Sequence, residues 1–179
     1  MKKYSKFIER IRFIKFEWQE EYLMFLYSIR NDNDFLKFCT KRNYSITFEE
    51  FRNELENDFK DDRYEQYIIE SQESKPIGTV YSYSFNRIKK YFFFSIFLVC
   101  EYRKYSYGVG SILGFLNMSF AKNDLEKIYF DVYEYNSNIL KMINRYSKTF
   151  LEVERFANRR EIKNDKYDII RFVVNIENF

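Results

Sequence analysis

The stretch from 92 to 120 limits the possible folds of this chain more than any other part of the sequence. It starts with an apolar run rich in Phe, Ile and Val, passes through a basic, tyrosine-rich loop and reaches Gly108-Val109-Gly110. Beyond the loop, apolar residues recur at the spacing of one helix face: Val109, Ile112, Leu113, Leu116 and Phe120. The pattern predicts a strand, a loop and a helix with a glycine-rich start. Free backbone N–H groups and the helix dipole at such a start make a site for an anion.

The apolar spacing of the remaining chain predicts an α+β domain around this unit. Strands are expected at 10–16, 64–71, 78–86, 91–99, 127–133, 150–156 and 167–175, and helices at 20–30, 47–62, 109–120 and 136–146. Short turns join three consecutive strands at 64–71, 78–86 and 91–99, which favours an antiparallel meander. We expect one domain over residues 1–179, with a mixed, mostly antiparallel sheet of about six to seven strands flanked by about four helices.

Histidine is absent from the chain, and cysteine occurs only as Cys39 and Cys100. Two cysteines are too few for a disulfide scaffold and fit a reducing cytoplasm. Without histidine the chain lacks the commonest general base and the commonest zinc ligand, so no metal is expected. The longest apolar run, at 91–100, is about half of what a bilayer-spanning helix needs, and the N-terminal residues lack a signal-peptide pattern. The expectation is a soluble, cytoplasmic protein with no membrane partner.

Charge is unevenly distributed along the sequence, although the net charge is only +3. The region at 85–104 is basic, whereas the region at 47–62 is acidic. A basic loop beside the strand–helix turn suits a phosphate-bearing ligand. Two solvated faces of opposite sign explain the same distribution equally well.

The element order, with a glycine loop between the fourth strand of the sheet and the helix after it, resembles the GNAT superfamily of N-acetyltransferases. In that family the loop has the pattern Gln/Arg-x-x-Gly-x-Gly/Ala, and the matching segment here is Tyr105-Ser106-Tyr107-Gly108-Val109-Gly110. Both glycines match, but a tyrosine stands in the first position. Further segments resemble the branch that acetylates ribosomal-protein N-termini and nucleotide-linked amino sugars: 28–32, 45–50, 75–79, 131–136 and 167–170.

The resemblance implies a GNAT-like sheet and an acetyl-CoA-dependent acetyltransferase in which a primary amine attacks the thioester directly within a ternary complex. As cofactor-binding residues it implies the fourth strand's end, the loop and one asparagine: Leu98, Val99, Arg103, Lys104, Tyr105, Ser106, Tyr107, Gly108, Val109, Gly110 and Asn136. A backbone N–H at Leu98 or Val99 would polarise the acetyl carbonyl. Arg103 or Lys104 would supply the charge that the loop's first position lacks.

Two residues are the catalytic candidates that the resemblance implies. Tyr146, on the apolar face of the last predicted helix, would protonate the leaving thiolate, and Glu134 would deprotonate the amine directly or through water. Asp131 and Glu101 are further candidates for the base. A buried tyrosine with a satisfied hydroxyl and a solvated carboxylate are the purely structural interpretations of the first two.

Several alternatives stay open at the level of sequence. The acceptor is a small amine or nucleotide-linked amino sugar, or else a protein N-terminus; an acidic helix beside it would favour a cationic amine. The unusual Tyr105, and Thr149 where the family has glycine before Phe150, motivate a non-catalytic protein that binds acyl-CoA or a partner on the same fold. Tyrosines interleaved with basic residues at 102–107 would also stack on RNA bases, although nucleic acid is not an expected partner. A homodimer through the last strands is left open.

Overall fold

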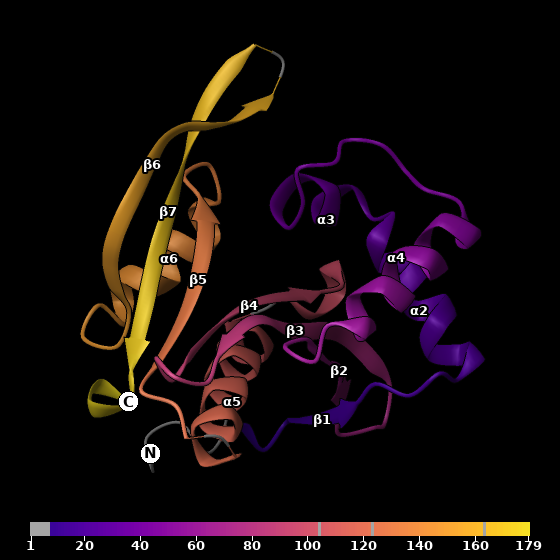
Figure 1. The fold of residues 1–179 in the computed structure, drawn as a ribbon, viewed down its shortest axis with the longest axis horizontal. Coiled ribbons are helices and arrows are strands. Elements are labelled where there is room, and N and C mark those ends of the chain that lie inside the picture. Colours follow the sequence, from indigo (N-terminus) through magenta and orange to yellow (C-terminus); the bar gives the residue numbers. More distant parts are fainter. Residues whose placement is uncertain (1–7, 104, 123, 163) are drawn as a thin grey trace.

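The computed structural model describes residues 8–179 except 104, 123 and 163. It contains one seven-stranded sheet with helices on both faces (Figure 1). In chain order the elements are β1 (Ile11–Lys15), α2 (Glu20–Arg30), α3 (Asn33–Phe38), α4 (Phe48–Lys60), β2 (Glu65–Ser71), β3 (Pro76–Asn86), β4 (Tyr91–Leu98), α5 (Tyr105–Lys122), β5 (Lys127–Tyr133), α6 (Ser137–Arg145), β6 (Leu151–Ile162) and β7 (Asp165–Asn175). The strand order is β1-β2-β3-β4-β5-β7-β6, which confirms the predicted mixed, mostly antiparallel sheet.

The sheet is open in its middle, between β4 and β5. Every other neighbouring pair is antiparallel, but these two strands are parallel, and their pairing stops at Phe93 opposite Tyr129. Beyond that point β4 continues to Leu98 and β5 to Tyr133 without bonding to each other. Figure 1 shows the two halves of the sheet diverging from their common end. The unpaired halves of β4 and β5 therefore border a gap within the sheet.

Side chains that alternate along β2 explain why helices cover both faces. Ile69 belongs to the main core, where α5 and α6 pack on one face of the sheet. Ile68 points to the opposite face and joins residues of α2 and α4, such as Leu26 and Phe51. A third, smaller cluster joins α2 and α3 to β4 through Phe97. The meander and its flanking helices thus form the rigid half of the molecule that ends at the gap.

Local hydrogen bonds fix the starts of α3 and α4. Thr47 and Glu50 form a capping box: the Glu50 N–H donates to Thr47 Oγ1 at 3.2 Å, and the Thr47 N–H donates to Glu50 Oε2 at 2.8 Å. Asp32 starts α3, because its Oδ1 accepts from the N–H of Asp34 at 2.8 Å and of Phe35 at 3.2 Å. The sequence predicted the first of these helices, at 47–62, but no helix at 33–38.

Two helix ends near the glycine loop differ from the sequence prediction. Helix α5 begins at Tyr105 rather than Val109, so Gly108 is its fourth residue. Because the first four N–H groups of a helix, those of the N-cap and the first three residues, lack partners within it, the free amides among the described residues are those of residues 105–107. The N–H groups of Gly108, Val109 and Gly110 lie within the hydrogen-bonded helix and are not available to an anion. Helix α6 ends at Arg145, with Tyr146 as its C-cap.

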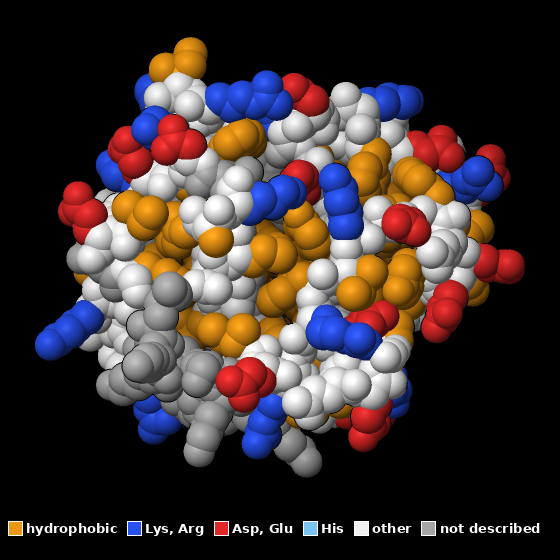
Figure 2. Space-filling model, turned by 90° about the horizontal axis from the view of Figure 1, so that it is seen from below, with side chains coloured by type: hydrophobic (Ala, Val, Ile, Leu, Met, Phe, Trp, Pro, Cys, Tyr) orange, Lys and Arg blue, Asp and Glu red, His pale blue; other side chains and the backbone are white. Residues whose placement is uncertain are grey.

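The surface gives little support to any one face as the contact of a homodimer. Seen from below, hydrophobic side chains gather across the middle of the molecule, and charged side chains occupy the margin (Figure 2). On β6, the large apolar side chains that are exposed are the aliphatic Leu151 and Val153, so no exposed aromatic of that strand marks a dimer contact. The homodimer stays a prediction. Within the described ranges, no helix has the length and apolar character needed to cross a membrane.

Candidate active site

Two cavities meet at the gap between β4 and β5. The glycine cavity, of about 550 Å³, lies between the start of α5 and helix α6 and includes Gly108. The tyrosine cavity, of about 470 Å³, lies between α2, α4 and the sheet and includes four tyrosines. Six residues line both cavities: Phe38, Cys39, Ile96, Ile112, Asn136 and Ile139. A molecule in one cavity can therefore reach a molecule in the other through the opening in the sheet.

The end of β4 presents backbone groups to this opening. The Val99 N–H donates to the Ile77 carbonyl oxygen of the loop-to-β3 junction at 2.9 Å. Because peptide groups of successive residues face opposite edges of a strand, those of Leu98 and Ile96 face away from β3 and toward β5. The Leu98 carbonyl confirms the direction, since it accepts from Arg103 Nε at 2.7 Å. The prediction for the Val99 N–H is wrong because β3 already uses it, whereas the Leu98 N–H remains a candidate to polarise a carbonyl.

The start of α5 borders the glycine cavity with no side chain in the way. A Cβ atom built on Gly108 would meet no other atom within 4 Å, so the space in front of this residue is open. Arg103, Lys141 and Arg145 also line the cavity and make its lining basic. Free amides, open space and positive charge together suit the phosphates of a ligand. The sequence analysis missed Lys141 and Arg145, because only the packing of α6 brings them to the loop.

The other predicted residues of the cofactor set have varied positions. Leu98, Arg103, Gly108, Val109 and Asn136 line the glycine cavity. Tyr107 packs against the core and meets Tyr102 edge to face at 5.3 Å, and Gly110 is buried. Only the backbone of Tyr105 and Ser106 is described, and Lys104 lies outside the described residues. The cofactor roles of these five remain predictions.

Arg103 is held in place by several groups of its surroundings. Its guanidinium pairs with Asp34, lies 3.8 Å from Asp32 Oδ1 and stacks over the ring of Phe97 at 4.7 Å. Together with the Leu98 carbonyl, these partners tie the loop after β4 to the start of α3. Two carboxylates already balance the Arg103 charge, so its position favours support of the β4 end over direct phosphate binding.

Asn136 stands between the two cavities and starts α6. Its side chain caps the helix, accepting from the Ile139 N–H at 3.5 Å, and it lines both cavities. The amide nitrogen of the side chain is not used by this cap, since only Oδ1 accepts. Capping and contact with a ligand are therefore compatible roles for this residue.

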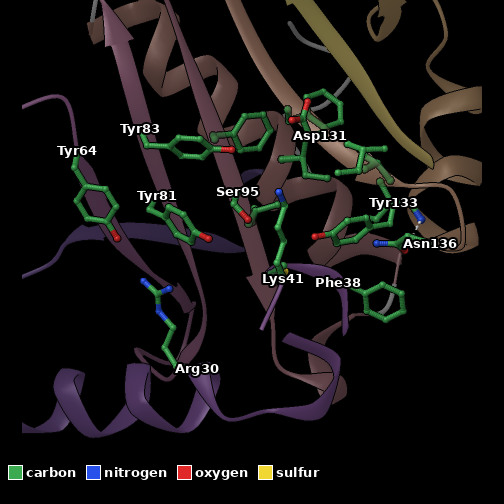
Figure 3. Close-up of a pocket in the computed structure, with 18 of the residues that line it drawn as sticks. Arg30, Phe38, Lys41, Tyr64, Tyr81, Tyr83, Ser95, Asp131, Tyr133 and Asn136 are labelled. Carbon is green, nitrogen blue, oxygen red and sulfur yellow. Dashed lines mark hydrogen bonds between the residues drawn. The ribbon is translucent and has the colours of Figure 1, made fainter. Parts of the chain in front are cut away.

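Aromatic hydroxyls dominate the tyrosine cavity. Tyr64 turns its hydroxyl toward Arg30, Tyr81 turns its hydroxyl into the middle of the cavity, and Tyr133 turns its hydroxyl toward Lys41 (Figure 3). Burial raises the pKa of Tyr64 well above its ordinary value and that of Tyr133 to about 12. These phenols are consequently neutral at physiological pH. They serve as hydrogen-bond donors and acceptors rather than as bases.

The two predicted catalytic residues line neither cavity. Glu134 Oε1 accepts from the Asp168 N–H at 2.9 Å, which turns this carboxylate to β7. Tyr146 packs half-buried against the core at the end of α6. Asp131 does line the tyrosine cavity and is paired with Arg171 at 2.8 and 2.9 Å. Asp58, on α4, also lines it, although the sequence showed only an acidic helix face there.

This open sheet, with a helix that starts at a glycine loop beside the gap, is the fold of the GNAT N-acetyltransferases. Among solved structures, the chain is similar to spermidine N-acetyltransferase from Vibrio cholerae in complex with CoA and spermine, with a TM-score of 0.84 and 18% identity over 95% of this chain and 98% of that chain. A dodecameric form of the Vibrio cholerae enzyme gives a TM-score of 0.76 and 18% identity over 93% and 94%.

At this level of identity the likeness establishes the fold. No protein-family model and no curated protein matches the chain. The neighbours are polyamine acetyltransferases, so the finer resemblance to acetyltransferases of ribosomal-protein N-termini and nucleotide-linked amino sugars is not supported.

Proposed function

We propose that this protein is an acetyl-CoA-dependent N-acetyltransferase that acts on a primary amine. The observation that carries the proposal is the meeting of the two cavities at the gap between β4 and β5. One cavity has a basic glycine loop for a phosphate-bearing donor, and the other has polar side chains for an acceptor. The similar Vibrio cholerae enzyme was solved with CoA and spermine, a donor product and an amine, which supports the same division of roles.

The donor would occupy the glycine cavity. Its pyrophosphate would lie at the free amides of residues 105–107, and Lys141 and Arg145 would add positive charge. Its acyl arm would follow the open edge of β4, where the peptide groups of Ile96 and Leu98 face the gap. Asn136 would contact the arm with its free amide nitrogen. Such an arrangement places the thioester at the point shared by both cavities.

Acetyl transfer needs proximity, a donor for the oxyanion and a path for one proton. The amine nitrogen forms a bond to the acetyl carbon, and the C–S bond of the thioester breaks. The amine loses one proton, and the CoA thiolate gains one. The Leu98 N–H would stabilise the oxyanion. Of the carboxylates considered for the base, Asp131 lines the tyrosine cavity, but both of its oxygens accept from Arg171, and one would have to leave Arg171 to take the proton.

Tyr146 as the acid and Glu134 as the base remain proposals, and they are less well placed because neither residue lines a cavity. Glu134 would need to release the Asp168 N–H before it reached an acceptor, and Tyr146 would need a change in α6 to reach the glycine cavity. Water or the acceptor's own ammonium would otherwise carry the proton. A Tyr146→Phe variant tests the acid role. If Tyr146 is the acid, turnover should fall while acetyl-CoA affinity stays unchanged.

Calorimetric titration with acetyl-CoA and a thiol-release assay over a panel of amines test the proposal. We expect saturable binding of acetyl-CoA and release of CoA thiol only when a suitable amine is present. Failure to bind at millimolar acetyl-CoA would refute the proposal. Binding without turnover on small amines, polyamines, amino sugars and peptides would favour the non-catalytic protein instead.

A further inference from the structure

Arg30, the last residue of α2, places a buried cation in the tyrosine cavity. Its side chain is only 16% exposed, and its guanidinium lies 5.5 Å from the ring centroids of both Phe35 and Tyr81. Figure 3 shows the Tyr64 hydroxyl directed toward it, whereas the Tyr81 hydroxyl points into the middle of the cavity. Burial lowers the pKa of Arg30, but its neighbours Tyr81, Tyr64 and Asp58 more than offset this effect. Arg30 is therefore a fixed positive charge with hydroxyl groups beside it.

The charge on Arg30 is incompletely matched by the protein. Among the described residues, its ion-pair partner is Asp58, whose Oδ2 lies 3.5 Å from Arg30 Nη2. This is a long contact, and the Asp58 side chain is 41% exposed. Burial also raises the pKa of Asp58, so its charged form is disfavoured at the place where Arg30 needs it. A guanidinium in such a position has capacity left for a second anion.

The rest of the cavity adds positive rather than negative charge. Lys41 extends its ammonium into the middle of the cavity (Figure 3), and none of the described carboxylates forms an ion pair with it. Asp131 is held in two hydrogen bonds by Arg171. Of the acidic residues of α4, only Asp58 lines the cavity. The cavity consequently lacks the surplus of carboxylates that a polycationic amine needs.

We infer that the acceptor amine carries an anionic group, a carboxylate or a phosphate, that Arg30 binds while the amine points into the gap. The inference rests on the proposed function and specifies its acceptor. Lys41 lies on the flank of the same anion, and the Tyr81 hydroxyl donates a hydrogen bond to it. The Tyr64 hydroxyl already donates to Gln66 Oε1 at 2.8 Å. Tyr81 pairs with Ser95, which directly precedes Ile96 at the gap. The amine and the anion are thus one to two strand spacings apart, about 5–10 Å.

Matched pairs of amines test this inference directly. We would compare 4-aminobutyrate with 4-aminobutyramide, glucosamine 6-phosphate with glucosamine, and both anionic amines with spermidine. The readouts are kcat/KM and the calorimetric affinity of each amine for the CoA-bound protein. We expect the anionic member of at least one pair to be preferred at least tenfold, and the pair that shows it identifies the anion as carboxylate or phosphate. Equal use of both members in both pairs, or a preference for spermidine, would overturn the inference.

An Arg30→Gln variant assigns the preference to a residue. It should reduce the ratio within the preferred pair to near one while leaving acetyl-CoA affinity unchanged. Arg52→Gln is the matched control, because Arg52 lies on the outer face of α4 in a pair with Glu56 and touches neither cavity. An unchanged ratio in a folded Arg30→Gln protein contradicts the inference.

Because Arg30 is largely buried, Arg30→Gln could fail to fold, and a second variant therefore tests the inference independently. Lys41→Met changes an exposed residue and should lower the same ratio at least threefold; a constant ratio counts against the inference. Failure of the proposed function is distinguishable, because it abolishes turnover of every amine. The calorimetric comparison within each pair still decides, without turnover, whether the cavity prefers an anionic amine.

Discussion

Replacing Gly108 by alanine should change the stability of the fold and the binding of acetyl-CoA in opposite directions. Gly108 is the fourth residue of α5, and it has no positive φ angle that alanine would resist. A Cβ atom there would enter open space in the glycine cavity. In the free protein the substitution therefore creates no clash and improves helix propensity by up to about 1 kcal/mol. We expect the thermal midpoint of the apo protein to rise by about 2–4 °C per kcal/mol.

The same methyl group should weaken acetyl-CoA binding. It occupies the space through which a phosphate oxygen would approach the free N–H groups of residues 105–107. Losing one charge-assisted hydrogen bond costs about 1.5–3 kcal/mol, which corresponds to a loss in affinity of about 10- to 150-fold. Isothermal titration with acetyl-CoA measures the affinity, and differential scanning calorimetry of the apo protein measures the stability.

Opposite signs in the two measurements make the prediction specific. Gly114→Ala is the matched control, since it makes the same change in the same helix but points its Cβ at Phe13 Cε2, 3.0 Å away and on the core side. Acetyl-CoA affinity should be unchanged in that variant. If Gly108→Ala folds normally and still binds acetyl-CoA as the native protein does, the pyrophosphate does not lie at the start of α5, and the assignment of the glycine cavity to the donor is refuted.

Three further predictions concern stability and reactivity. Asp58→Asn should raise the free energy of unfolding at pH 7. Burial raises the pKa of the Asp58 carboxyl in the folded protein, so its charged form opposes folding. The gain in stability, measured by chemical denaturation, should vanish below about pH 3.8. Thr47→Ala should cost about 1 kcal/mol of stability by urea unfolding. Hydrogen bonds from the Thr47 N–H and hydroxyl lower the pKa of Glu50, and the variant removes only the hydroxyl, so NMR titration should show this pKa move part of the way back to its ordinary value. Iodoacetamide at pH 8 should modify the exposed Cys100 well before Cys39, whose pKa burial raises to about 12; equal rates by mass spectrometry would contradict the packing around Cys39.

Most of the fold was accessible from sequence because its signals are local. Alternation with period two marks each strand of the sheet, and the 3.6-residue spacing marks α2, α4, α5 and α6. Helix α3 was missed for a physical reason. Its six residues are too few to show a periodicity, and the Asp32 that caps it belongs to a polar run that reads equally well as a break.

The site could be predicted from sequence only where a single continuous segment forms it. The glycine loop was found because its glycines, its basic residues and its helix are contiguous. Val99 was misassigned because a shift of one residue along β4 turns its N–H to the other edge of the strand. Lys141 and Arg145 reach the loop from α6 through tertiary packing, which no local pattern reports.

The sign of charge in the acceptor cavity shows why an acidic segment is a poor guide to a ligand. The run at 47–62 favoured a cationic acceptor, yet its capping box and apolar stripe orient α4 so that only Asp58 reaches the cavity. Arg30 and Lys41 come instead from the end of α2 and the loop after α3. The chain shares its fold with the Vibrio cholerae spermidine enzyme. Under the proposed function, these few charged side chains would select the amine, so acceptor preference would differ between proteins whose sheets superpose.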